Sequence, residues 1–113
     1  MTPTCLFCRI VAGEIPSPRL AESEFAIAIR DISPQAPFHA LVLPRAHVQS
    51  LAHVSESALL GDVLLLAARL AREAGLDEGG YRVVLNTGDN GGQTVQHLHA
   101  HVLGGRAMGW PPG

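Results

Sequence analysis

The chain contains no lysine, and its eight basic residues, all arginines, are set against ten acidic ones. The formal net charge of −2 leaves no strongly basic surface of the kind that general binding to nucleic acid or to acidic membranes requires. The N-terminal residues lack the pattern of a signal peptide, and the most apolar stretch contains Asp62 and Arg69 and is too short to span a bilayer. We therefore expect a cytoplasmic protein with neither nucleic acid nor membrane as a partner.

Aromatic residues and cysteines are also scarce. Aromatics make up 4% of the chain against 47% hydrophobic residues, which excludes intrinsic disorder and predicts an aliphatic core. A chain of 113 residues without repeats or linkers suits one domain, residues 1–113. The two cysteines, Cys5 and Cys8, have a spacing that suits a shared metal ion better than a structural disulfide.

The hydrophobic pattern predicts more strands than helices. Four stretches have the alternating or continuous apolar character of strands: residues 24–31, 39–45, 81–86 and 95–103. Apolar residues from Leu59 to Ala74 repeat at helical spacing, with Ser55 or Ser57 as the N-cap and Gly75 as the stop. Residues 5–14 predict a short helix that ends near Gly13, and residues 14–20 predict an extended connection. Strands in runs with one long helix between them favour an α+β fold with an antiparallel sheet.

Three histidines, His97, His99 and His101, occupy every second position of the last predicted strand. In a strand these side chains share one face, where they could bind a metal, act on phosphate or acyl groups, or switch with pH. The glycine-rich stretch at residues 87–94 leads directly into this strand, and such loops hold anions on backbone N–H groups. The juxtaposition favours phosphate chemistry, with His99 as the nucleophile and its neighbours fixing its tautomer.

The chain resembles the histidine triad (HIT) superfamily of nucleotide hydrolases and transferases, and within it the Hint branch of histidine triad nucleotide-binding proteins. The motifs that carry the resemblance are CLFCRIVAGEIPS, RDISPQAPFHALVLPRAH, NTGDNGGQTVQHLHAHVLGGR and the final WPPG. It implies a HIT-like fold whose five-stranded antiparallel sheet carries one long and one short helix, and a homodimer that forms a ten-stranded sheet. It also implies hydrolysis of purine nucleoside phosphoramidates, such as adenylate linked to lysine or another amine, through a nucleotidyl-histidine.

The resemblance also implies a role for individual residues. His99 is the nucleophile, and His101 and His39 complete the imidazole cluster around the phosphate. The residues expected at the phosphate and leaving-group side are Asn86, Gly92, Gln93 and Thr94. The residues expected around the rest of the nucleotide are Asp31 at the ribose hydroxyls, Ile32 on the sugar, and Phe7, Ile10, Ile15 and Ile29 around the base. From the residues alone, capping of its own turn is the favoured role of Asp31, and the match to the DISPQAP motif reverses that preference. Trp110 either closes a pocket across the dimer or is an exposed tail residue.

Zinc is a separate expectation. A closed tetrahedral zinc site needs two ligands besides Cys5 and Cys8, and the resemblance points to His47 and His97. Such a zinc ion is structural and is not required for catalysis. The alternative is a pair of buried free thiols beside a helix. If His97 binds zinc, it does not titrate in the active site.

Three other functions compete with phosphoramidate hydrolysis. One is hydrolysis of dinucleoside polyphosphates, which the Hint-like WPPG tail disfavours. Another is a nucleotide-binding interaction module with incidental turnover, against which the intact His99 argues. The last is a metal enzyme that uses all three histidines of the row as ligands, and the separate cysteine pair weakens it.

Overall fold

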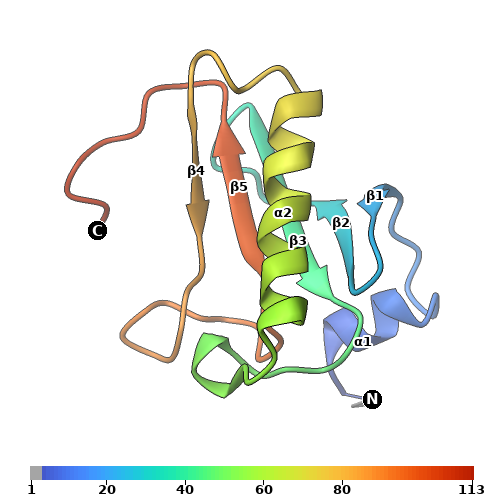
Figure 1. Ribbon diagram of the computed structural model, residues 1–113. Coiled ribbons are helices and arrows are strands. Elements are labelled where there is room, and N and C mark those ends of the chain that lie inside the picture. The colour runs from blue at the N-terminus through green and yellow to red at the C-terminus, as the bar shows by residue number, and fades with distance from the viewer. Residues whose placement is uncertain (1–3) are drawn as a thin grey trace.

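The computed structural model describes residues 4–113 and contains a five-stranded antiparallel sheet with strand order β1-β2-β3-β5-β4 (Figure 1). The strands are β1 (Arg19–Glu22), β2 (Ala26–Arg30), β3 (Phe38–Pro44), β4 (Tyr81–Val84) and β5 (Ala100–Gly104). The helices are α1 (Leu6–Val11), the 3-10 helix η1 (Leu51–His53) and α2 (Ser57–Glu73). The predicted α+β fold, with one long and one short helix on a five-stranded sheet, is confirmed.

The two faces of the sheet carry side chains of different size. Alanine and valine side chains, among them Ala28, Val42 and Val102, lie under α2, which crosses the sheet in Figure 1. Their small size lets the long helix approach closely. Larger side chains, among them Ile29 and Leu43, face the opposite side and pack with α1. The site described below lies on this second face.

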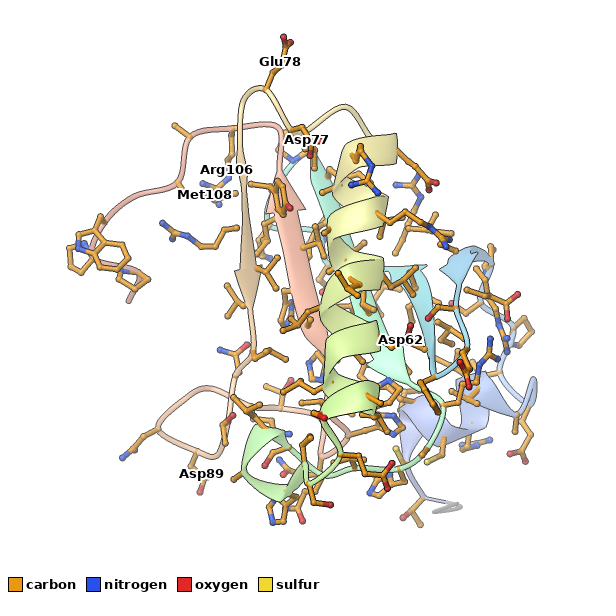
Figure 2. All side chains as sticks on the ribbon, viewed as in Figure 1. Asp62, Asp77, Glu78, Asp89, Arg106 and Met108 are labelled. Carbon is orange, nitrogen blue, oxygen red and sulfur yellow. The ribbon has the colours of Figure 1, made fainter. Side chains whose placement is uncertain are left out.

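A carboxylate on α2 holds the β1–β2 turn. Asp62 accepts hydrogen bonds from the Ser23 hydroxyl (2.6 Å) and from the Phe25 amide (2.8 Å), and Figure 2 shows it on the side of the helix that faces β1 and β2. Among the described residues, no helix is long and apolar enough to cross a membrane.

Several predicted element boundaries were wrong. β5 begins at Ala100 and not at residue 95, and the sequence pattern did not reveal β1, which is only four residues long. α2 begins with Glu56 at its N-cap position and without a side-chain cap, so neither Ser55 nor Ser57 has that role. Gly75, with a φ of +76°, follows the end of the helix as predicted.

Pro44 explains the late start of β5. The β3–β5 ladder pairs Val42 with Ala100, and its continuation would bring Pro44 opposite residue 98. Proline has no amide hydrogen to donate to a ladder. The Pro44 carbonyl is also occupied, because His97 Nε2 lies 2.8 Å from it. Residues 95–99 therefore run beside the end of β3 without forming a strand.

Candidate active site

An apolar hollow of about 360 Å³ lies between α1, the end of β2 and the segment that leads into β5. This volume is in the range of small-molecule sites. The residues predicted for the nucleotide that line it are Phe7, Ile10, Ile15, Ile29, Asp31, Ile32 and Thr94, together with His99 and His101. The residues that line it without having been predicted are Leu6, Pro16, Ser17, Arg30, Leu41 and Val95. Leu6 and Val95 neighbour predicted residues in the sequence, but no periodic pattern marks them.

Other predicted residues lie outside the lining of this hollow. His39 is buried behind His101, with its Nε2 2.9 Å from His101 Nδ1. Asn86 donates from Nδ2 to the Gly91 carbonyl at 2.7 Å and so braces the glycine-rich loop. Trp110 is 83% exposed on the C-terminal tail, which runs out beyond β4 in Figure 1.

Gln93 organises the glycine-rich loop from inside. Its side-chain amide donates to the Gln49 carbonyl (2.7 Å) and to the Val95 carbonyl (3.1 Å), and its Oε1 accepts from the Gly88 amide (3.0 Å). The Gly92 amide is also used within the loop, because it donates to the Asp89 carbonyl (Figure 2 shows Asp89 on the loop). Gly92 has a φ of +77°, which favours glycine at this position.

The hydrogen bonds of His99 define which of its nitrogens is available. Nδ1 lies 2.7 Å from the His97 carbonyl oxygen, which only accepts, so Nδ1 carries the proton. In the neutral ring the lone pair is therefore on Nε2. The ring is 7% exposed and contacts the hollow. His99 thus has the protonation pattern of a nucleophile that attacks through Nε2.

A directional chain of hydrogen bonds sets the tautomers of the other two imidazoles. The Gln35 amide donates to His39 Nδ1 at 3.0 Å, so in neutral His39 the proton is on Nε2. That N–H faces His101 Nδ1 at 2.9 Å and the Asp31 carboxylate at 3.3 Å. When His101 accepts at Nδ1, its own proton is on Nε2. His101 is thus a hydrogen-bond donor beside His99, whose ring centroid is 5.0 Å away.

Burial, together with the smaller effects of the charges of His99 and His39, lowers the pKa of His101 to about 4 against the opposing effect of Asp31. His101 is therefore neutral near pH 7. Burial also lowers the pKa of His97, with smaller contributions from His47 and His99 and an opposing one from the Pro44 carbonyl.

Asp31 caps its own turn, which is one of the two roles considered for it from the sequence, and it also lines the hollow. Its Oδ1 accepts from the Ser33 amide at 2.8 Å, which caps the turn after β2. Its Oδ2 faces His39 and lies 3.9 Å from His101 Nδ1, and the residue lines the hollow. The turn bond holds the carboxylate at the rim and leaves the second oxygen for the interior.

Two cysteines and two histidines converge next to the hollow. Cys5 Sγ lies 3.3 Å from His97 Nδ1, and Cys8 Sγ lies 3.2 Å from His47 Nδ1 and 3.6 Å from His97 Nδ1. In a tetrahedral zinc site, sulfur and nitrogen ligands are about 3.6 Å apart, given Zn–S bonds of about 2.3 Å and Zn–N bonds of about 2.0–2.1 Å. His97 Nε2 donates to the Pro44 carbonyl, which leaves Nδ1 free as a ligand. The four residues therefore fit a closed zinc site.

A second group of possible ligands, Asp31, His39 and His101, also has donor atoms within 4.8 Å of one another. It does not fit a metal in the same way. A metal at His39 Nε2 would move the proton to Nδ1, where it would meet the Gln35 amide, which is itself a donor. The tautomer fixed by that amide thus disfavours metal binding among the three groups.

The sheet, the histidine row and the loop that precedes it define a histidine triad domain, and the chain belongs to the HIT family: its residues 12–108 match the HIT domain model.

Proteins similar to this one match nearly the whole length of the chain. A 14 kDa zinc-binding protein of Zea mays is 46% identical over 116 residues, which cover 99% of this chain and 89% of that protein. The crystal structure of a HIT family hydrolase from Legionella pneumophila has 48% identity and a TM-score of 0.94, and covers 97% of this chain and 100% of that one. A histidine triad nucleotide-binding protein from Candida albicans has 34% identity and a TM-score of 0.84 over 96% and 83% of the two chains.

Proposed function

We propose that this protein hydrolyses purine nucleoside phosphoramidates, such as adenylate linked to lysine or another amine, to the nucleoside monophosphate and the free amine. The observation that carries the proposal is the protonation pattern of His99, whose Nδ1–H is held by the His97 carbonyl while Nε2 keeps its lone pair beside the hollow. The similarity to the Legionella HIT family hydrolase and to the Candida nucleotide-binding protein supports both the reaction class and the ligand class.

The reaction follows from the contents of the hollow. Phe7, Ile10 and the other apolar residues receive the base, and Asp31 Oδ2, which also lies 3.3 Å from His39 Nε2, accepts from the ribose hydroxyls. His99 Nε2 attacks phosphorus, and the P–N bond breaks as its electron pair goes to nitrogen, which takes up a proton from solvent water and leaves as the free amine. Water then attacks the nucleotidyl-histidine, which releases the monophosphate and restores the imidazole. The neutral His101 donates its Nε2–H to a phosphate oxygen and thereby stabilises the charge that develops there.

We further propose that Cys5, Cys8, His47 and His97 hold a structural zinc ion. The zinc ion would cross-link α1 to the ends of the central strands and would take no part in the reaction. The donor distances and the 46% identity to the zinc-binding protein of Zea mays support this assignment. Total zinc in protein purified without added metal should be about one ion per chain.

We also propose a homodimer in which β4 pairs with its partner copy to form a ten-stranded sheet. β4 is an edge strand, and its Tyr81 and Val83 side chains are each 37% exposed. An unpaired edge with apolar side chains readily adds another strand, and a two-fold axis is the commonest way to close such a pair. Light scattering at dilute concentration tests the dimer. Cys5 and Cys8 are buried and form no disulfide, which supports a cytoplasmic location.

Steady-state hydrolysis of an adenosine phosphoramidate tests the proposed reaction. His99→Ala should lower turnover by about 10³-fold or more while it retains binding of adenosine monophosphate (AMP), because it removes the nucleophile and not the slot. His53→Ala, which replaces an exposed histidine outside the hollow, is the matched control. Near-normal turnover in His99→Ala would refute the mechanism. Faster cleavage of a dinucleoside polyphosphate than of the phosphoramidate would refute the substrate class.

A further inference from the structure

His97 connects the cysteine–histidine cluster to the nucleophile, His99. Its Nδ1 faces the thiols of Cys5 and Cys8 at 3.3 and 3.6 Å, while its own carbonyl oxygen accepts the Nδ1–H of His99 at 2.7 Å. The ring is fully buried and is also held by the Pro44 carbonyl. A change in the position of His97 therefore moves the group that orients His99.

Phe7 forms a second link between the two sites. It lies in α1 between the two cysteines, and its ring meets His97 edge-on at 5.8 Å and His99 edge-on at 5.1 Å. It is 4% exposed and lines the hollow proposed for the base. The same ring thus contacts a metal-site histidine, the nucleophile and the base slot.

The short helix α1 is one of the walls that the two sites share, and the other includes Thr94 and Val95. Leu6 lines the nucleotide hollow and also a second hollow of about 390 Å³, whose other walls include Cys5 and His47. A helix of six residues has little stability of its own, since helices shorter than about 12–15 residues are marginal in water. The position of α1 therefore depends on what holds it to the sheet, and the cluster lies at its N-terminal end.

We propose that the Cys5–Cys8–His47–His97 cluster positions the catalytic site, so that a metal bound there and a nucleotide bound in the hollow strengthen each other's binding. His97 and Phe7 are the positioning residues that transmit the effect. The coupling is reciprocal by thermodynamic necessity: the factor by which zinc raises AMP affinity equals the factor by which AMP raises zinc affinity. We expect a factor of about 5 or more, the lower end of typical couplings. The inference rests on the proposed nucleotide site but not on the phosphoramidase reaction.

The first measurement is competition for zinc between the loaded protein and a chromogenic chelator, with and without saturating AMP. The second is calorimetric AMP binding to the zinc-loaded and the zinc-stripped protein. AMP should raise the zinc affinity about 5-fold or more, and zinc should raise the AMP affinity by the same factor. If stripping unfolds the protein, the competition measurement on loaded protein still decides the question.

Two variants separate coupling from general stabilisation by a ligand. Phe7→Leu keeps an apolar side chain but loses both edge-on contacts, so the coupling factor should fall toward 1. Ile15→Val weakens the same slot away from His97 and should lower AMP affinity while the coupling factor remains. In the cadmium-substituted protein, AMP should shift the ¹¹³Cd resonance of the wild type and of Ile15→Val, and shift it little in Phe7→Leu.

The outcomes distinguish this inference from the proposed function. Zinc and AMP that both bind but with unchanged affinities for each other would overturn the coupling and leave the proposed function intact. An equal coupling factor in Phe7→Leu and the wild type would overturn the route through Phe7. A loaded protein that binds no AMP would overturn the nucleotide site and the coupling with it.

Discussion

Acidification from pH 7 to pH 5 should destabilise the protein through His101, and the variant His101→Gln should lack this part of the loss. The pKa of His101 in the folded protein is about 4, below the ordinary value of 6.5, because burial and the neighbouring imidazoles disfavour its charged form. Between pH 7 and pH 5 the unfolded chain therefore takes up a proton at His101, and the folded protein does not. Stability is present above pH 6.5 and is lost as the pH falls toward 4.

The magnitude follows from the two pKa values. The free energy of unfolding should fall by about 2 kcal/mol between pH 7 and pH 5, and by about 3 kcal/mol by pH 4. The side chain of His101 is 21% exposed, so solvent screens little of this effect. A loss of this size is a substantial part of the total stability of a typical small domain, about 5–15 kcal/mol.

Urea unfolding followed by circular dichroism at pH 7 and pH 5 measures the effect. The wild type and the control His53→Gln should lose about 2 kcal/mol more than His101→Gln. His97, whose pKa is also lowered by burial, is the same in all three proteins, so any contribution from it cancels in the comparison. An equal loss in His101→Gln and the wild type would show that His101 is not held neutral by its surroundings.

Two further predictions concern packing and the loop. Leu43→Ala replaces a fully buried side chain on the α1 face and should lower the free energy of unfolding, measured in urea, by about 2–5 kcal/mol. Leu65→Ala replaces a side chain on α2 that is 72% exposed and should lower it by less than about 0.5 kcal/mol. Equal losses in the two variants would contradict the assignment of the core. Gly91→Ala would bring a Cβ into the backbone carbonyl of Thr87 and should weaken AMP binding, measured by calorimetry, about 10-fold or more, a change of about 1.4 kcal/mol. The control Gly79→Ala, whose Cβ meets open space, should leave AMP binding unchanged. A Gly91→Ala protein with normal AMP affinity would refute a role for the loop's shape in binding.

Local sequence patterns were sufficient for much of the fold. The alternation of alanine and isoleucine in residues 26–29 predicted the strand, because the period of two is a property of the strand itself. The pattern indicated a half-buried strand, which was wrong, because α2 covers the alanine face and α1 packs on the isoleucine face. The long helix and its stop at Gly75 followed from periodicity and from the conformational freedom of glycine in the same way. β1 was missed because four residues after two prolines carry too little periodicity to be recognised.

The motifs around the histidine row identified the family, and the residues they pointed to for the base lie around one hollow. The tertiary structure decided the protonation pattern. His99 Nε2 keeps its lone pair because of a carbonyl two residues away, and His101 is a donor because the Gln35 amide reaches His39 on another strand. No periodicity of the sequence encodes the direction of such hydrogen bonds.

The metal cluster depended still more on the tertiary structure. Cys5 and His97 are 92 positions apart, and they meet only because α1 packs on the face of the sheet toward which His97 is turned. The sequence supplied ligands of the right kind. Their convergence required the long-range packing of α1 against the central strands. Because α1 is short, the position of the side of the hollow that it forms also depends on that packing.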